Sequence, residues 1–235
     1  MKDLGIKLYA DGADIQELYN LYILGKINGI TTNPTLMQKS GVTNYELFAK
    51  KMLELIPDIP ISFEVFSDDP ETMEKEARKI SLWGNSVYVK IPVTYTNGIA
   101  TTNLIKKLSE DGIKLNVTAI LTFNQVQMVL HYLSKETPSI ISVFAGRIAD
   151  TGVNPENTMK ISSILVKNRN TELLWASTRE VYNIIQARNC GCDIIMVTPD
   201  ILKKLPMLGK DLSELSLDIV KMFYNDAKEA RYKIL

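Results

Sequence analysis

The sequence predicts an α/β protein that folds as a single (β/α)8 TIM barrel, and three observations support this. Eight short segments rich in β-branched and aromatic residues recur along the 235 residues. Segments with helical periodicity separate them, which is typical of a parallel sheet. The rival architecture, an open doubly wound sheet, usually has fewer strands, and no glycine-rich phosphate loop follows the first strand here. A closed barrel is therefore expected.

Strand and helix segments alternate along most of the chain. The expected strands are Ile6–Asp11, Gly29–Asn33, Ile61–Phe66, Val87–Ile91, Leu115–Ile120, Ile140–Phe144, Leu173–Ser177 and Asp193–Val197. The expected helices and turns are Asp14–Leu24, Tyr45–Ile56, Pro70–Trp83, Asn97–Asp111, Phe123–Leu133, Pro155–Val166, Glu180–Asn189 and Pro199–Leu205. An extra helix, Leu212–Tyr232, follows the eighth strand. We therefore expect one barrel domain, residues 1–235, with residues 211–235 as its C-terminal helical extension.

Composition excludes several classes of partner. The 27 basic and 27 acidic residues give a formal net charge of zero, so neither nucleic acid nor a membrane is expected as a partner. No run of eighteen apolar residues and no N-terminal signal core are present. Cys190 and Cys192 fit a reducing compartment, so a cytoplasmic location is expected. His131 is the one histidine, which makes a multi-histidine metal site impossible.

Lys90 is the most informative residue, because it lies within the apolar strand Val87–Ile91. A buried ammonium group is unfavourable unless it is paired or deprotonated. Desolvation favours the neutral amine, which is the form that attacks carbonyl groups. Lys90 is therefore expected to be the nucleophile of a Schiff-base enzyme. The alternative is a structural ion pair between Lys90 and Glu64.

Alternation along the strands places polar side chains inside the barrel. Residues two apart share a face, and the apolar face should pack on the helices. In the seventh strand, this rule places Leu174 and Ala176 outside and Trp175 and Ser177 inside. In the other strands, the expected inward residues are Asp11, Thr31, Asn33, Ser62, Glu64, Lys90, Asn116, Thr118, Ser142 and Phe144. Catalytic residues of such barrels lie at the carboxyl ends of the strands, where these residues would meet.

Several of these residues also have ordinary structural explanations. Asp11 fits a turn residue or a helix cap, and Asn33 fits a turn before proline. The segment 177–180 matches a capping box, in which Ser177 would cap the next helix. A capped helix N-terminus is also an anion site, so this does not exclude a function for Ser177.

Two arginines follow strands at the rim where this fold usually binds phosphate. Arg147 follows the sixth strand and Arg179 follows the seventh, close to Ser177. Arginine offers bidentate, permanently charged contacts that suit a phosphate group. We expect these three residues to bind phosphate, although each arginine alone fits a solvated surface position.

Taken together, the motifs resemble the transaldolase family, in particular its short-chain, fructose-6-phosphate aldolase-like branch. The resemblance runs from the first strand to the eighth. The matching stretches are Asp11, Gly29–Thr35, Val89–Pro92, Gly112–Thr118, Ser142–Ile148 and, more loosely, Ala176–Arg179.

The resemblance implies a class I aldol mechanism that needs neither metal nor cofactor. Lys90 would form the Schiff base, and Asp11 would be the general acid/base. Glu64 and Thr118 would hold the catalytic water. The other implied roles are substrate binding by Thr31, Asn33, Asn116, Ser142 and Phe144, and phosphate binding by Arg147, Ser177 and Arg179.

Two positions favour a transferase over a lyase. The resembling fructose-6-phosphate aldolases carry glutamine at the position of Glu64 and tyrosine at that of Phe144. The expected reaction is therefore transfer of a dihydroxyacetone unit from sedoheptulose 7-phosphate or fructose 6-phosphate to an aldose phosphate, in the pentose phosphate pathway. Thr178 stands where longer transaldolases carry phenylalanine, which leaves the acceptor open. A related aldolase, and a barrel that binds sugar phosphates without turnover, are the alternatives.

The C-terminal helix carries enough apolar surface, including Ile219, Val220, Met222 and Phe223, to need a partner. In the resembling short-chain proteins, such helices reach a neighbouring subunit in ring-shaped oligomers. A homo-oligomer, as a pentamer or a decamer, is therefore expected.

Overall fold

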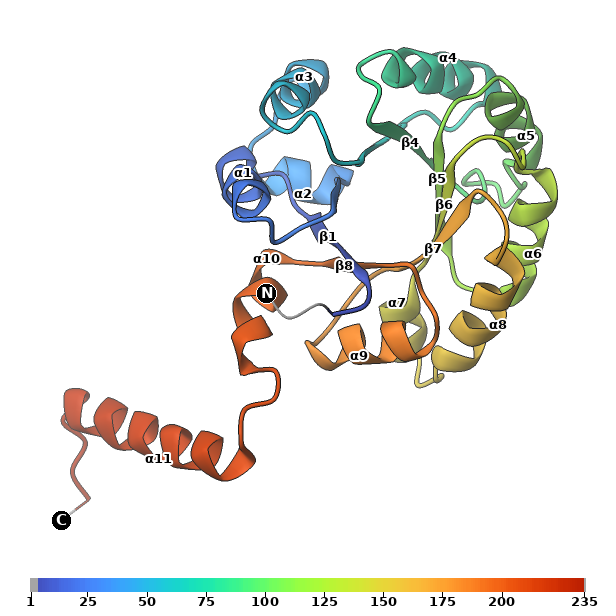
Figure 1. Cartoon of the computed structure of the whole chain (residues 1–235). Helices are drawn as coiled ribbons and strands as arrows, with labels where there is room; N and C mark the ends of the chain where they lie inside the picture. Colours follow the sequence, from blue (N-terminus) through green and yellow to red (C-terminus); the bar gives the residue numbers. More distant parts are fainter. Residues whose placement is uncertain (1–3, 235) are drawn as a thin grey trace. The chain divides into compact units, whose positions relative to one another are not determined.

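The computed structural model describes residues 4–234 and confirms the (β/α)8 barrel (Figure 1). Parallel strands close in the order β1 to β8, and β8 pairs with β1. The strands are β1 Lys7–Asp11, β2 Gly29–Thr31, β3 Ile61–Glu64, β4 Val87–Pro92, β5 Leu115–Ile120, β6 Ser139–Val143, β7 Thr171–Trp175 and β8 Ile194–Val197.

The helices follow the strands as expected, with two additions. The described helices up to residue 204 are α1 Ile15–Ile23, α2 Pro34–Lys39, α3 Tyr45–Leu55, α4 Pro70–Ser81, α5 Thr102–Glu110, α6 Phe123–Tyr132, α7 Ala145–Asp150, α8 Glu156–Val166, α9 Tyr182–Asn189 and α10 Pro199–Lys204. Helices α2 and α7 were not predicted. Each is a short helix at the carboxyl end of a strand, and each positions residues of the cavity described below.

Helix α2 begins directly where β2 ends, and the local sequence explains why. The Asn33 side chain accepts a hydrogen bond from the Leu36 N–H at 3.0 Å, and Pro34 occupies the first helical position. An asparagine cap followed by proline is a favoured helix start. The turn predicted at Asn33 is therefore a helix cap.

An apolar cluster fills part of the barrel interior. It consists of buried residues from several strands, namely Tyr9, Tyr88, Ile140, Leu174, Ala176 and Ile194. Gly29 on β2 makes room for the Tyr9 ring, since a Cβ atom at this position would lie 2.4 Å from it. Tyr9 therefore requires glycine at its neighbour on β2.

The facing predicted for the seventh strand is wrong. Leu174 and Ala176 belong to the interior cluster, so they face into the barrel rather than the helices. Trp175 lies between them and faces away from the interior. Both faces of a barrel strand are buried, and the segment Leu173–Ala176 is apolar on both. Its sequence therefore does not alternate between polar and apolar residues, and the inward face cannot be predicted from it.

The chain forms two compact units, of which the first ends at Leu202 and the second begins at Lys203. The second unit contains a 3-10 turn, Leu205–Met207, and helix α11, Leu212–Glu229. Asp211 caps α11 by accepting hydrogen bonds from the N–H groups of Ser213 and Glu214. Across residues 4–234, no helix is both long enough and apolar enough to cross a membrane.

Candidate active site

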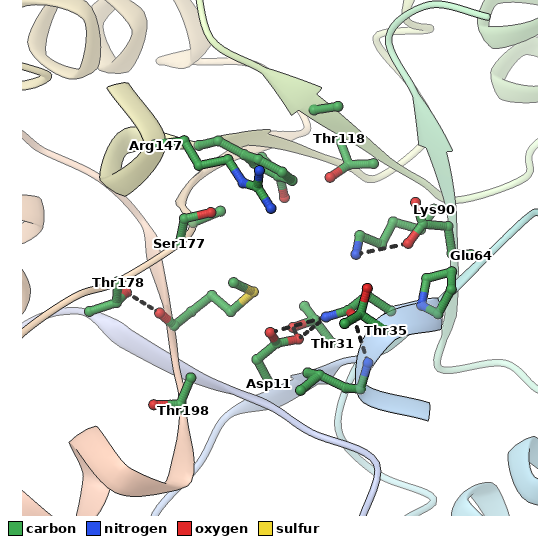
Figure 2. Close-up of a pocket in the computed structure, with 18 of the residues that line it drawn as sticks. Asp11, Thr31, Thr35, Glu64, Lys90, Thr118, Arg147, Ser177, Thr178 and Thr198 are labelled. Carbon is green, nitrogen blue, oxygen red and sulfur yellow. Dashed lines mark hydrogen bonds and ion pairs between the residues drawn. The ribbon is translucent and has the colours of Figure 1, made fainter. Parts of the chain in front are cut away.

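All but one of the predicted site residues line one cavity of about 540 Å³, to which the carboxyl ends of the strands contribute (Figure 2). The predicted residues that line it are Asp11, Thr31, Asn33, Glu64, Lys90, Thr118, Ser142, Phe144, Arg147, Ser177 and Arg179. Asn116 does not line the cavity, because it is fully buried. It supports the wall instead, by accepting a hydrogen bond from Ser142 Oγ at 2.7 Å and donating one to Ser62 Oγ at 3.0 Å.

Lys90 and Glu64 form an ion pair inside this cavity. Strand register places the two residues directly across from each other on β4 and β3. Lys90 Nζ lies 3.2 Å from Glu64 Oε2 and donates a hydrogen bond to the Thr32 carbonyl at 3.0 Å. The Lys90 side chain is 8% exposed and that of Glu64 is 19% exposed. The pairing predicted as the structural alternative therefore exists, and it lies where a carbonyl compound in the cavity can reach Nζ.

Asp11 is a second carboxylate in the same cavity, at the end of β1 (Figure 2). It accepts a hydrogen bond from Thr31 Oγ1 at 2.9 Å and longer ones from the Asn33 amide at 3.3 and 3.4 Å. Burial raises the pKa of Asp11, and the charge of Lys90 and these hydrogen bonds oppose that rise only in part. A carboxyl group with a raised pKa suits proton transfer near neutral pH. The cap of α1 is Asp14, so the helix-cap explanation for Asp11 is wrong.

Thr118 contributes a buried hydroxyl group to the cavity. Among the described residues, none forms a hydrogen bond with its buried Oγ1. A shift of register between Val117 and Ile120, with a φ of 60° at Ala119, places Thr118 and Ala119 together on the cavity wall. A buried hydroxyl without a partner is rare in proteins. Its position in a cavity therefore indicates a site for a water molecule or a substrate group.

The arginines lie at another part of the cavity wall. The Arg147 guanidinium, on α7, lies 5.7 Å from the centre of the Phe144 ring. Arg179 pairs through two nitrogens with Asp150, one turn after Arg147 on the same helix. Asp150 therefore ties Arg179 to the helix that carries Arg147, and its negative charge lies beside both cations. The Arg147 guanidinium and the Arg179 nitrogen that Asp150 does not hold are the groups that could bind an anion here.

Ser177 lines the cavity, but the strand alternation that predicted this does not extend to it. It lies just beyond β7 with a φ of 62°, a left-handed conformation that interrupts strand alternation. Its carbonyl leaves no space for a side chain at Gly146, where a Cβ atom would lie 1.6 Å away. The capping-box interpretation is wrong, because α9 begins at Tyr182 without a side-chain cap. The side chain that stabilises this turn is that of Asn183, whose Oδ1 accepts a hydrogen bond from the N–H of Arg179 at 2.8 Å.

Several residues of the cavity were not predicted, including Lys39, Met196 and Thr198. Lys39 ends the unpredicted helix α2, so only the structure brings it to the cavity. Met196 and Thr198 are two residues apart at the end of β8, and the alternation rule could have found them had it been applied to that strand. Thr178 also lines the cavity, and its hydroxyl donates to the Met196 carbonyl.

Comparison with known proteins identifies the family. The model of the family described as "Transaldolase/Fructose-6-phosphate aldolase" matches residues 8–234. The chain belongs to the transaldolase/fructose-6-phosphate aldolase family. A "Probable transaldolase" of Ruegeria sp. (strain TM1040) is 34% identical over 232 residues, with coverage of 98% of this chain and 100% of the relative. A second, of Thermoanaerobacter sp. (strain X514), is 33% identical over 233 residues and covers 97% and 100%. These names suggest a transaldolase-type enzyme.

Solved structures with low sequence identity agree on the fold. A structure titled "Crystal structure of KGPDC from Streptococcus mutans" superposes with a TM-score of 0.57 at 12% identity and covers 84% of this chain and 90% of that one. An enolase-superfamily member from Agrobacterium tumefaciens gives a TM-score of 0.59 at 9% identity, over 84% of this chain and 50% of the other. Within the part of this family member that the structure describes, no group of three His, Cys, Asp or Glu residues could hold a metal ion.

Proposed function

We propose that this protein is a class I transaldolase that transfers a dihydroxyacetone unit from a ketose phosphate to an aldose phosphate. The donors would be sedoheptulose 7-phosphate and fructose 6-phosphate, as in the pentose phosphate pathway. The single observation that supports this most strongly is the cavity in which Lys90 Nζ lies 3.2 Å from Glu64 Oε2, with the Asp11 carboxylate lining the same cavity. A lysine, a proton acceptor beside it and a second carboxylate are the groups that Schiff-base aldol chemistry requires.

In this mechanism, Lys90 first loses a proton to Glu64, which is in direct contact with it. The neutral amine attacks the C2 carbonyl of the ketose and forms a carbinolamine. Glu64 then returns a proton to the C2 hydroxyl through a water molecule held by Thr118, and water leaves to give the protonated imine. The unpartnered Oγ1 of Thr118 supports this placement of the water.

Carbon–carbon cleavage then uses Asp11. Its carboxylate removes the proton from the C4 hydroxyl, the C3–C4 bond breaks, and the electron pair moves into the imine to give an enamine on Lys90. The aldose phosphate leaves, and an acceptor aldehyde adds by the reverse steps with Asp11 as acid. Hydrolysis finally releases the new ketose and restores the amine of Lys90.

The remaining residues of the cavity bind the substrate in this proposal. Asn33 and Ser142, with Asn116 behind Ser142, lie on the wall and would hold the dihydroxyacetone hydroxyls. Arg147, Arg179 and Ser177 would hold the phosphate. The Phe144 ring supports the Arg147 guanidinium, and Thr31 holds Asp11.

The test is to incubate the protein with fructose 6-phosphate, with and without erythrose 4-phosphate. Sedoheptulose 7-phosphate should form only when the acceptor is present. Free glyceraldehyde 3-phosphate and dihydroxyacetone without acceptor would favour the lyase instead. Borohydride with saturating ketose should leave a covalent adduct on Lys90, detected by mass spectrometry. An unmodified Lys90 would contradict both enzymatic functions.

We also propose that the protein is a homo-oligomer, as a pentamer or a decamer. Helix α11 supports this, because it leaves Leu217, Val220 and Phe223 exposed within its own unit. Light scattering on the full-length chain and on a chain that ends at residue 210 would measure the difference. Equal masses for the two chains would contradict a role of α11 in assembly.

A further inference from the structure

Strand β2 lies beside Glu64 on β3 but does not form the expected backbone hydrogen bonds with it. Along β2, alternate residues bond to β3: the Ile30 N–H donates to the Pro60 carbonyl and the Thr32 N–H donates to the Ser62 carbonyl. The next donor in this parallel ladder is residue 34, opposite the Glu64 carbonyl. Pro34 has no N–H, so β2 has nothing to donate there.

The carbonyl group that would accept a hydrogen bond from the Glu64 N–H already has another donor. In the same ladder, the Glu64 N–H would donate to the Thr32 carbonyl. That carbonyl instead accepts a hydrogen bond from Lys90 Nζ at 3.0 Å. Both backbone groups of Glu64 therefore lack their strand partners on this side, at the residue whose carboxylate pairs with Lys90.

The hydroxyl group of Tyr45 forms hydrogen bonds with both of these backbone groups. The Glu64 N–H donates to Tyr45 Oη at 2.7 Å, and the Tyr45 hydroxyl donates to the Glu64 carbonyl at 3.1 Å. Burial raises the pKa of Tyr45, so the hydroxyl stays protonated and can donate near neutral pH. One side chain on α3 thus supplies the donor and the acceptor that β2 does not.

The position of the Tyr45 ring is itself well determined. Tyr45 is the first residue of α3, and the Asn44 side chain caps that helix by accepting from the Leu47 N–H at 2.9 Å. The ring packs against three other aromatic rings, with centroids at 6.1 Å for Phe63, 4.7 Å for Phe66 and 5.4 Å for Trp83. The hydroxyl is therefore held in place by contacts that do not involve the cavity.

We propose that Tyr45 is a positioning residue for the Lys90–Glu64 pair: its hydroxyl replaces the missing strand partners of Glu64 and so leaves the Thr32 carbonyl free to hold Lys90 Nζ. Tyr45 does not line the cavity, so a substrate bound there would not contact it. Its effect on turnover passes through the backbone of Glu64 and the carbonyl of Thr32. The part of this inference that concerns turnover rests on the proposed function, whereas the part that concerns the Glu64 backbone does not.

The experiment is the variant Tyr45→Phe, which removes only the hydroxyl and keeps the ring contacts. Without it, the only acceptor that the described chain leaves for the Glu64 N–H is the Thr32 carbonyl, which Lys90 Nζ already occupies. The amide is therefore hydrogen-bonded for only part of the time, and it competes with Lys90 Nζ when it is. We expect kcat to fall about tenfold, which corresponds to the loss of one hydrogen bond of ordinary strength, with KM for the ketose phosphate changed less than about twofold. Hydrogen–deuterium exchange of the Glu64 amide should become faster.

Two control variants separate the hydroxyl group from the packing around it. Trp83→Phe loosens the aromatic cluster while it keeps the Tyr45 hydroxyl, and Tyr88→Phe removes a tyrosine hydroxyl from the interior cluster. Both should leave kcat within about twofold of the wild type, since Trp83→Phe keeps an aromatic ring against Tyr45 and both variants keep the Tyr45 hydroxyl bonded to Glu64. Thermal unfolding of all three variants shows how far each loses stability.

Three results would overturn the proposal: a Tyr45→Phe protein with wild-type kcat, one with unchanged exchange at the Glu64 amide, or one that does not fold. The last would show that the hydroxyl supports the fold and not the site. If the wild type itself forms no adduct on Lys90, the proposed function fails, and the exchange of the Glu64 amide still decides whether Tyr45 holds this strand.

Discussion

Replacing Lys90 by methionine tests whether its pair with Glu64 serves catalysis or holds the barrel together. Methionine keeps an unbranched side chain and removes the charge. At the 3.2 Å separation of Nζ and Oε2, the attraction between unit charges is about 5 kcal/mol at an effective dielectric constant of about 20. Withdrawing both ions from water costs several kcal/mol per ion and offsets most of this attraction. Lys90→Met leaves the Glu64 carboxylate unpaired, but that side chain is 19% exposed and can be solvated from the cavity. The free energy of unfolding should therefore fall by about 2 kcal/mol, less than the loss of about 3–5 kcal/mol expected for a fully buried unpaired charge.

The assay combines urea unfolding, followed by circular dichroism, with borohydride trapping in the presence of a ketose phosphate. Lys90→Met should fold and should form no adduct. Glu64→Gln is the matched variant: it leaves the buried ammonium without its carboxylate, so it should be less stable than Lys90→Met. The double variant should recover part of that loss. A Lys90→Met protein that is unfolded, or is destabilised by more than about 4 kcal/mol, would refute the reasoning and support a structural ion pair.

Three further predictions concern other parts of the barrel. Gly29→Ala places a methyl group against the Tyr9 ring and should lower the free energy of unfolding by about 2–3 kcal/mol, measured in urea; a smaller loss would show that the ring can move. Burial raises the pKa of Asp11, so the folded protein binds this proton more tightly than the unfolded chain does. The stability that this proton contributes is lost as the pH rises from the pKa of Asp11 in the unfolded chain through its pKa in the folded protein. The stability of the wild type relative to Asp11→Asn, from urea titrations at successive pH values, should therefore fall with rising pH, and an increase would contradict the raised pKa. Asp150→Asn releases Arg179 and should raise KM for a phosphorylated acceptor about threefold to tenfold in steady-state assays, with KM for an unphosphorylated aldehyde unchanged; equal effects on both acceptors would count against a phosphate site.

The strand alternation in the sequence predicted much of the candidate site. The polar residues Glu64, Lys90 and Ser142 stand between apolar neighbours, and a strand with one polar and one apolar face can be oriented from its pattern alone. The same rule gave the wrong facing in the seventh strand. Leu174 and Trp175 are both apolar and both buried, so the pattern there contains no difference between inside and outside.

The turns after the strands were harder to predict than the strands themselves. Ser177 lines the cavity because its φ is positive, not because alternation continues to it. Helix α2 brings Lys39 to the cavity, and α7 brings Asp150 to Arg179. Short helices of six residues have too few residues to show a clear period, so they were missed.

The sequence by itself determined the number and order of the strands, the longer helices between them, the barrel, and the lysine and carboxylates at the ends of its strands. These depend on local periodicity and on the cost of burying charge, which are properties of short segments. Only the tertiary structure decided that Tyr45 completes the hydrogen bonds of Glu64 and that Asp150 pairs with Arg179. Such contacts join residues from different elements, and their geometry depends on how the whole barrel closes, which no short segment encodes.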